Sequence, residues 1–332
     1  MWEIRRYSDS NKKEWNDFVA QSRNSTFLFD RNYMDYHSDR FSDYSLMAYR
    51  HGKLAAVLPA NEKGDALYSH LGLTYGGWVW APRGLDTTDL YLLWHSWIEY
   101  CSKAGFERII YKPLPYIYSE MPSQEDLYFL FLSKANLIST DISTTIDLES
   151  DTEFNMLQKR HLKKVPEDFY CEVVNFEETG QIKDFHKMLS LCLEERHDNI
   201  PVHSLDELER LMAAFPEDIV IWGAYSDGKL QAGICVYEAG ITAHCQYIAT
   251  TAIGRERNLL PPLVKEMLDY YTEEGFRYFD FGTSNEGNGQ YLNNGLNRQK
   301  TSFGGSGVAY SKFEINLSSA LASLQTSLWP PK

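Results

Sequence analysis

The chain of 332 residues contains the same succession of patterns twice. Residues 46–59 (LMAYRHGKLAAVLP) and residues 221–236 (IWGAYSDGKLQAGICV) each predict two strands joined by a tight turn that contains glycine. Further along each half, at residues 94–112 and 264–282, a helix ends at a glycine and leads into a strand. Solenoid repeats recur about every 20–50 residues, so this much longer period predicts a duplicated α/β domain.

Length and composition agree with two domains. A chain of 332 residues is long for a single core and comfortable for two cores. Apolar residues make up 43% of the chain and aromatic residues 14%, which is enough to fill both. A polar, proline-containing stretch over residues 113–150 separates the two patterns. We therefore predict one domain over residues 1–150 and a second from residue 151 onward.

Charge and cysteine usage narrow the functional classes. A net charge of −14 opposes non-specific binding to DNA or to an anionic membrane, because the field of the protein repels phosphate. The five cysteines are widely spaced and form no C-x-x-C, which favours a reducing compartment over a disulfide framework or a cysteine zinc site. No apolar run approaches the ~20 residues of a membrane span. A cytoplasmic protein without a membrane span is expected.

The two halves predict the following elements. The first half begins with a strand over residues 2–7, a helix capped by Ser10, and a second helix over residues 27–41; a strand over residues 67–82 is interrupted at Gly76-Gly77. The second half begins with a basic helix and two further helices, followed by a three-stranded meander. Its elements are expected at residues 154–165, 179–193, 204–214, 218–226, 229–238, 241–250, 259–274 and 277–282, then a Gly/Asn-rich loop at 282–295 and a last strand at 307–316.

A pair of helices, three antiparallel strands, a helix and a strand is the element order of the GNAT N-acyltransferase fold. The segment Asp280-Phe281-Gly282-Thr283-Ser284-Asn285-Glu286, followed by G-L-x-x-x-K-x-x-F-G-G from Gly295 to Gly305, resembles the C-terminal signature of the FemAB family. Tyr75-Gly76-Gly77 looks like a matching feature of the first half. The resemblance implies an α/β (α+β) fold of two tandem GNAT-like domains, each a mixed sheet with flanking helices. It also implies that a C-terminal helix at residues 317–332 completes domain 1–150, which leaves 151–316 as the second domain.

The resemblance implies an N-acyltransferase. The preferred reaction moves an acyl group from acetyl-CoA or another acyl-CoA to an amine on a cell-envelope or nucleotide-sugar precursor. One alternative is aminoacyl transfer from a charged tRNA to a peptidoglycan precursor, as in the FemAB family proper. The acidity of the chain and the lack of room for a long helical arm count against tRNA. Another alternative is a non-catalytic binding module on the same fold. Neither DNA binding nor a particular oligomeric state is predicted.

The expected donor site lies between the strands at 243–250 and 277–282, which separate in GNAT-like folds and expose backbone N–H groups. The residues that follow the first of these strands could receive a pyrophosphate at the start of the next helix. Arg255 and Arg257 could instead be solvated loop residues. The Q/R-x-x-G-x-G/A loop of acetyltransferases is missing, which places coenzyme A binding in question. The residues expected to bind the donor are Thr250, Thr251, Gly254, Arg255 and Arg257.

Three residues are expected to take part in the chemistry. By resemblance Lys300 faces the donor or acceptor, although an exposed loop lysine is the ordinary alternative. Asp280 ends a buried strand and could orient an amine, or it could cap the glycine turn after it. Tyr247 could protonate the leaving group, and the alternation of a strand predicts that it points away from its neighbour His244.

Substrate contacts are predicted outside the donor strands, and no metal is expected. Arg160 and Lys164 share one face of the basic helix, where they could bind a phosphate or remain solvated. The stretch LCLEERHDNIPVH contains acidic residues and histidines, but their spacing fits no metal-ligand motif. The residues expected to bind substrate are Tyr75, Arg160, Lys164, Asn285 and Glu286.

Overall fold

The computed structural model describes residues 2–174, 180–197 and 200–326. The chain divides into two compact units: unit 1 takes residues 1–141, 287–290 and 309–332, and unit 2 takes residues 142–286 and 291–308. The strands β9 (Asn136–Asp147) and β17 (Ser306–Asn316) contribute residues to both units. Each unit combines a mixed sheet with helices, which confirms the predicted α/β class.

Unit 1 divides its strands between a four-stranded sheet and part of a larger sheet. One has the order β1-β3-β4-β7, and the other continues from β17 through β8, β6 and β5 to β2. The predicted first hairpin is present, and its turn places His51 and Gly52 at φ of 52° and 75°, as a type I′ turn requires. The strands are β1 (Trp2–Arg6), β2 (Ser42–Asp43), β3 (Leu46–Arg50), β4 (Lys53–Leu58), β5 (Asn61–Lys63), β6 (Ala66–Tyr68), β7 (Val79–Trp80) and β8 (Arg108–Tyr111).

Two breaks explain why unit 1 has two sheets. Pro59 follows β4 and has no N–H to donate, so β5 starts as a separate strand. The expected long strand over residues 67–82 is present only at its ends, as β6 and β7. Between them, a Cβ on Gly76 would lie 1.7 Å from the carbonyl oxygen of Ser69, so only glycine fits this close backbone approach.

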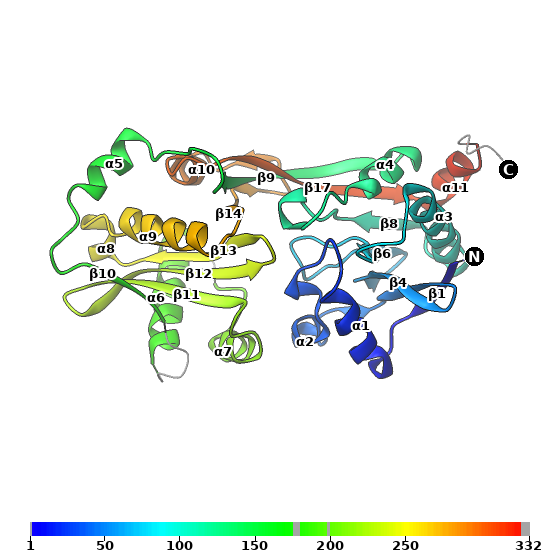
Figure 1. Ribbon diagram of the computed structural model, residues 1–332, viewed down its shortest axis with the longest axis horizontal. Helices are drawn as coiled ribbons and strands as arrows, with labels where there is room; N and C mark the ends of the chain where they lie inside the picture. Colours follow the sequence, from blue (N-terminus) through cyan, green and yellow to red (C-terminus); the bar gives the residue numbers. More distant parts are fainter. Residues whose placement is uncertain (1, 175–179, 198–199, 327–332) are drawn as a thin grey trace. The chain divides into compact units, whose positions relative to one another are not determined.

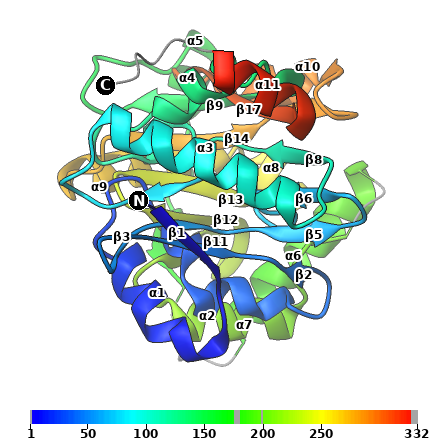
Figure 2. The same cartoon turned by 90° about the vertical axis from the view of Figure 1, so that its right-hand side faces the viewer.

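The core of unit 1 is aromatic. The helix α3 (Thr87–Lys103) starts with a capping box between Asp86 and Asp89 and packs beside α4 (Glu125–Leu132) and α11 (Leu317–Thr326) (Figure 2). Leu324 of α11 is buried, and its carbonyl accepts a hydrogen bond of 3.2 Å from the Tyr91 hydroxyl. The C-terminal helix was predicted over residues 317–332, of which 327–332 lie outside the described residues. The large buried rings of this core include Trp78, Trp80, Trp94, Trp97, Tyr111 and Phe129.

Two helix predictions for unit 1 were wrong in detail. Ser10 does not cap the first helix; it lies within the 3-10 turn η1 (Asp9–Asn11), and α1 (Lys12–Val19) begins after Asn11. The helix expected over residues 27–41 is broken because Asp30 is extended, with φ −64° and ψ 138°. That stretch forms η2 (Phe27–Phe29), α2 (Arg31–Met34) and η3 (Asp35–His37), and η4 (Tyr116–Tyr118) lies further along the unit.

Unit 2 contains the predicted meander in one sheet. Its strands follow the order β10-β11-β12-β13-β14-β9, and Asp227 and Gly228 form the first turn with φ of 52° and 66°. Helix α9 covers one face of the meander, and α6 and α7 lie at the other (Figure 1). The strands are β10 (Tyr170–Val173), β11 (Ile219–Ser226), β12 (Lys229–Ala239), β13 (Thr242–Thr250), β14 (Tyr278–Thr283), β15 (Asn285–Glu286) and β16 (Tyr291–Leu292).

The helices of unit 2 agree with the sequence except in two places. Pro261 and Pro262 occupy the first turn of α9, as predicted. The sequence did not predict α8, which directly follows β13, or α10, which carries Lys300. The helices are α5 (Met156–Leu162), α6 (Gln181–His197), α7 (Leu205–Ala214), α8 (Ala252–Glu256), α9 (Leu260–Glu273) and α10 (Asn294–Thr301).

Candidate active site

A one-residue bulge in β13 decides which side chains share a face. Tyr237 of β12 pairs with His244, and Cys235 pairs with Tyr247, so β13 carries one extra residue between the two pairs. Paired residues point to the same side of a sheet, and Cys235 and Tyr237 are two positions apart. His244 and Tyr247 therefore share a face. The prediction that they point in opposite directions was wrong, because simple alternation does not account for a bulge.

The shared face is the one covered by α6. Ala232 and Ile234 belong to the core under α9, whereas a Cβ on Gly233 would lie 2.7 Å from the ring of Phe185 in α6. Alternation along β12 then assigns Cys235, and with it Tyr247, to the α6 side. Asp280 pairs with His244 in parallel register, so its side chain lies on this side as well.

Strands β13 and β14 are paired only at their beginnings. Their parallel register covers Thr242, Ala243 and His244 against Tyr278, Phe279 and Asp280, although β13 continues to Thr250. A cavity of ≈ 250 Å³ lies at the carboxyl end of β13. Thr250, Gly254 and Arg255 form one side of it, and the residues lining the remainder are Gln158, His161, Asn258, Leu260, Pro261, Gln299 and Phe303.

Asp280 and His244 form a dyad at the point where the strands separate. Nδ1 of His244 lies 2.8 Å from Oδ2 of the fully buried Asp280, whose other oxygen accepts hydrogen bonds from Ser143 and from Thr145 at 2.8 Å. Burial by itself raises the pKa of Asp280, but these hydrogen bonds and the imidazole outweigh it and leave the pKa below its ordinary value. The carboxylate is therefore charged, and Nδ1 of His244 donates to it. In neutral His244 the lone pair then lies on Nε2.

Lys300 is buried rather than exposed on a loop. It belongs to α10 and is 6% exposed, and its Nζ donates to the carbonyl oxygens of Gly282 and Thr283 at 2.9 Å and 2.7 Å. These carbonyls belong to the end of β14, directly after Asp280. Burial lowers the pKa of Lys300 to about 8, while Cys245 and Asp280 oppose that shift. The FemAB-like signature thus brings Lys300 and Asp280 to the same part of unit 2.

Tyr247 contacts a buried histidine on the same face. Its hydroxyl lies 2.6 Å from Nδ1 of His203 and accepts from the backbone N–H of His203 at 3.3 Å. His203 is 2% exposed, and its carbonyl lies 3.0 Å from Nε2 of His186 in α6. The phenol is therefore held in place by the segment that precedes α7.

The residues predicted to bind the donor have separate structural roles. The Thr251 hydroxyl accepts a hydrogen bond of 2.9 Å from the N–H of Gly254 and caps α8. Only glycine fits at 254, since a Cβ there would lie 2.2 Å from the Gln231 carbonyl oxygen. Arg255 reaches back to the carbonyl of Thr250 at 2.8 Å and lines the cavity.

Arg257 lies apart from this group. Its guanidinium pairs with Asp168 at 3.3 Å and Asp227 at 3.0 Å and donates to the Ser226 hydroxyl. It lines a neighbouring cavity of ≈ 410 Å³ together with the exposed Lys164. The two cavities share His161 and Asn258 as lining residues.

The other predicted substrate residues are not gathered at one place. Tyr75 is 3% exposed in the core of unit 1, where its ring meets Phe29 and Tyr118. Arg160 is exposed on α5, but this helix ends at Leu162, so Lys164 lies beyond it and the prediction that the two residues share a helix face was wrong. Asn285 accepts a hydrogen bond of 2.7 Å from the N–H of Ile142, and Glu286 accepts one of 2.9 Å from Asn293.

Neither a metal cluster nor a spanning helix occurs among the described residues. Within residues 2–174, 180–197 and 200–326, no three His, Cys, Asp or Glu side chains are grouped so that they could hold a metal ion. No helix in these ranges is both long and apolar enough to cross a membrane. Of the histidine-containing stretch before α7, Asp198 lies outside the described residues.

The sequence did not identify His244 as a partner of Asp280. Its distance along the chain from Asp280 carries no information about pairing, because the register of two strands follows from the whole sheet. A histidine on one predicted donor strand and an aspartate on the other was the available signal.

Comparisons with known proteins agree with this architecture. Residues 158–291 match the family described as acetyltransferase (GNAT) domain. The crystal structure of FemX superposes with a TM-score of 0.68 at 13% identity, covering 97% of this chain and 99% of FemX. The C-terminal domain of an assigned lysylphosphatidylglycerol synthetase from Agrobacterium fabrum gives a TM-score of 0.60 at 14% identity, with 96% and 95% covered.

A tandem GNAT protein from the clavulanic acid biosynthesis pathway gives a TM-score of 0.52 at 12% identity, covering 96% of this chain and 99% of that one. No curated protein sequence matches this chain. Identities this low establish the fold. Together with the GNAT domain match, they confirm the FemAB-like GNAT fold predicted from the C-terminal signature.

Proposed function

Since the fold of this chain is GNAT-type and FemAB-like, we propose that it is an N-acyltransferase whose active site lies where β13 and β14 separate. The observation that carries this proposal is the Asp280–His244 dyad beside the end of the parallel pairing, with Lys300 held on the neighbouring carbonyls. A charged, buried carboxylate that orients an imidazole is the arrangement of a general base. The His244 side chain is 14% exposed, so an amine can reach it from solvent.

In the proposed reaction the acceptor amine attacks the acyl carbonyl of the donor. Nε2 of His244 takes the proton from the attacking nitrogen as the new C–N bond forms. The ammonium of Lys300 uses two of its three donors on Gly282 and Thr283 and directs its charge toward the oxyanion. When the bond from the acyl carbon to the leaving group breaks, the hydroxyl of Tyr247 supplies the proton that the leaving group needs.

The donor we favour is an acyl-CoA such as acetyl-CoA, which is a co-substrate. Its pyrophosphate would lie near Thr250, Thr251, Gly254 and Arg255, where the cavity at the end of β13 opens. Arg255 keeps one contact with Thr250 and a long one of 3.5 Å with Glu195, so its guanidinium can rearrange around an anion. By the same resemblance the acceptor is an amine on a cytoplasmic cell-envelope or nucleotide-sugar precursor.

One observation favours the alternative donor, a charged tRNA. The cavity at the end of β13 and the neighbouring one share His161 and Asn258, and the second is lined by Lys164 and Arg257. A long donor with several phosphates would use both cavities, and Arg160 of α5 would add charge. A short thioester donor needs only the first.

Isothermal calorimetry separates these possibilities. Under our proposal acetyl-CoA binds the full chain, Arg255→Gln weakens that binding at least tenfold, and Lys164→Gln leaves it unchanged. Release of free thiol from acetyl-CoA in the presence of a panel of amines then reports transfer. Binding of a charged tRNA but not of acetyl-CoA would establish the alternative. Binding of neither would leave a non-catalytic binding module.

A further inference from the structure

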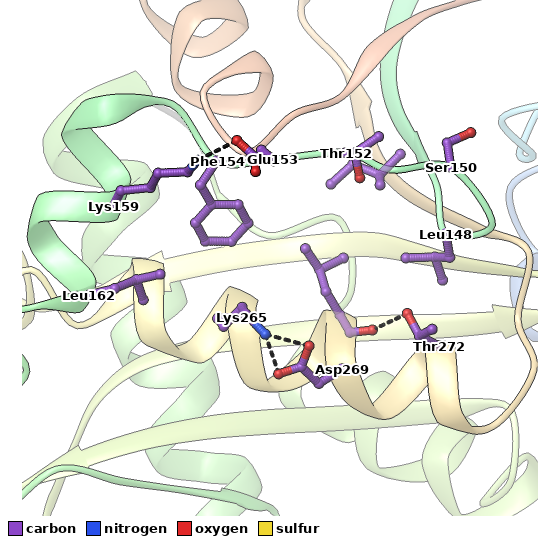
Figure 3. Close-up of a pocket in the computed structure, with 12 residues that line it drawn as sticks. Leu148, Ser150, Thr152, Glu153, Phe154, Lys159, Leu162, Lys265, Asp269 and Thr272 are labelled. Atoms are coloured by element: carbon purple, nitrogen blue, oxygen red, sulfur yellow. Dashed lines mark hydrogen bonds and ion pairs between the residues drawn. The ribbon is translucent and has the colours of Figure 1, made fainter.

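A third cavity of unit 2 lies against the exposed side of α9 (Figure 3). It measures ≈ 330 Å³, at the lower end of the ~300–1,000 Å³ typical of sites for small molecules. Four segments form it: the end of β9, residues 150–154, α5 and α9. The residues lining it are Ile146, Leu148, Ser150, Thr152, Glu153, Phe154, Lys159, Leu162, Lys265, Leu268, Asp269 and Thr272.

The lining combines an apolar floor with a balanced set of charges. Five side chains are apolar, and Ser150 and Thr152 contribute hydroxyls that make no hydrogen bond to the described part of the chain. The charged groups are two ammonium and two carboxylate groups, joined as the pairs Lys159–Glu153 and Lys265–Asp269 (Figure 3). The lining is therefore neutral overall, although it carries charges of both signs.

Both ion pairs are weak enough to open. The side chains of Lys265 and Asp269 are 47% and 54% exposed, and those of Lys159 and Glu153 are 39% and 71% exposed. Ion pairs at such exposure contribute little to stability because water screens them. Their groups can therefore turn toward a ligand at small cost.

We propose that this cavity binds a free amino acid with an apolar side chain. An anion bound to Lys265 would leave the carboxylate of Asp269 without its partner, and a cation bound to Asp269 would leave the ammonium of Lys265 without its partner. A zwitterion offers a partner to both groups at once, so no charge is lost. The apolar floor of leucine, isoleucine and phenylalanine side chains then buries the amino acid's own side chain.

The site is separate from the proposed catalytic site. Helix α5 lies between the two cavities, with Lys159 and Leu162 lining this one and Gln158 and His161 lining the cavity at the end of β13. The side-chain amide of Gln158 in α5 donates a hydrogen bond of 2.8 Å to the hydroxyl of Ser302, the residue that directly follows α10. A ligand behind α5 should therefore slow amide hydrogen exchange in residues 150–162. This proposal does not depend on the transfer reaction.

The probe is L-phenylalanine, titrated into the full chain by calorimetry and followed by hydrogen exchange. 3-Phenylpropionate lacks the ammonium group and phenethylamine lacks the carboxylate, so each should bind at least tenfold more weakly than the amino acid. If either binds as tightly as L-phenylalanine, or if the amino acid does not bind at millimolar concentration, the proposal is wrong.

Two variants place the binding in this cavity. Lys265→Gln removes one charged partner, and Thr152→Trp fills the space from an exposed position without touching the core. Each should weaken binding at least fivefold. Lys13→Gln is the matched control, because Lys13 and Asp17 form the same i,i+4 pair in unit 1. Unchanged binding in both cavity variants, or an equal loss in Lys13→Gln, would overturn the proposed location.

Discussion

The two units build the same meander in different ways. In unit 2, β12 and β13 run without interruption through one bulge and remain in a single sheet. In unit 1 the corresponding strands are each in two pieces, because Pro59 separates β4 from β5 and residues 69–78 separate β6 from β7. A bulge thus leaves the strand continuous and changes the face to which the following side chains point, whereas a break divides the strands between two sheets.

The same place in each unit has different chemistry. Strands β13 and β14 pair in parallel up to His244 and Asp280, and β6 and β8 pair in parallel up to Tyr68 and Ile110. Unit 2 therefore has an acid and an imidazole where unit 1 has a phenol and an aliphatic chain. In unit 1 the hydroxyl of Tyr111 accepts a hydrogen bond of 2.9 Å from the N–H of Trp78, so its aromatic ring lies at the break between β6 and β7. We infer that unit 2 carries the catalysis and unit 1 the larger aromatic core.

The largest effect should follow from replacing the dyad. We expect His244→Asn, whose amide nitrogen can replace Nδ1 as the donor to Asp280, to lower the rate of acyl transfer by about 10²–10⁴-fold, the usual contribution of a general base, while the melting temperature changes little. Tyr68→Phe in unit 1 is the control and should leave the rate within about twofold. Steady-state kinetics on both variants test the comparison, which fails if the two substitutions have equal effects.

Substitution of a buried polar residue in unit 1 should change the free energy of unfolding rather than the rate of acyl transfer. Asp126 is buried and accepts a hydrogen bond of 3.0 Å from the hydroxyl of Tyr111, and burial raises its pKa to about 7. A carboxyl whose pKa is raised on folding binds its proton more tightly in the native state, so stability falls as pH rises from about 4 to about 7. Asp126→Asn removes this loss and should increase the free energy of unfolding at pH 8 by on the order of 2–4 kcal/mol relative to pH 4. Urea denaturation at both values measures it, and an equal change at both would contradict the assignment.

Replacing Lys300 should weaken unit 2 as well as the reaction. Lys300→Met leaves the carbonyls of Gly282 and Thr283 without their donor, which should cost about 1–3 kcal/mol of unfolding free energy. An exposed loop lysine, the alternative left open by the sequence, would predict an unchanged fold for the same substitution. Lys103→Met, on the exposed side of α3, is the control and should change stability by less than about 0.5 kcal/mol. An unchanged Lys300→Met protein in urea denaturation would argue against the buried ammonium.

The smallest effect is expected in the core of unit 1. Tyr75→Phe removes a long hydrogen bond of 3.4 Å to Thr26 and keeps the buried ring, so stability should change by less than about 1 kcal/mol. The rate of transfer should not change. A rise in KM for the acceptor would instead support the prediction that Tyr75 contacts substrate and would give unit 1 a part in binding.

Local signals in the sequence predicted the turns and most of the helices. Gly52 and Gly228 marked hairpins because only left-handed backbone fits those turns, and Pro261 and Pro262 marked the first turn of α9. The FemAB-like signature contains both Asp280 and Lys300, which the structure brings close enough to interact electrostatically; their predicted part in the chemistry stays a prediction. What could not be predicted depends on contacts distant in sequence: the burial of Lys300, the pairing of His244 with Asp280, and the ion pairs that hold Arg257.

The extra residue in β13 also has a consequence for comparing sequences. Gln246 is the position that no residue of β12 opposes. A relative that lacks this residue would have the histidine and the tyrosine two positions apart in a regular strand, still on one face, whereas a relative of equal length without the bulge would present them on opposite faces. An alignment with a one-residue gap at 246 therefore still matches the two side chains in space, whereas two identical residues aligned without a gap do not guarantee a shared face.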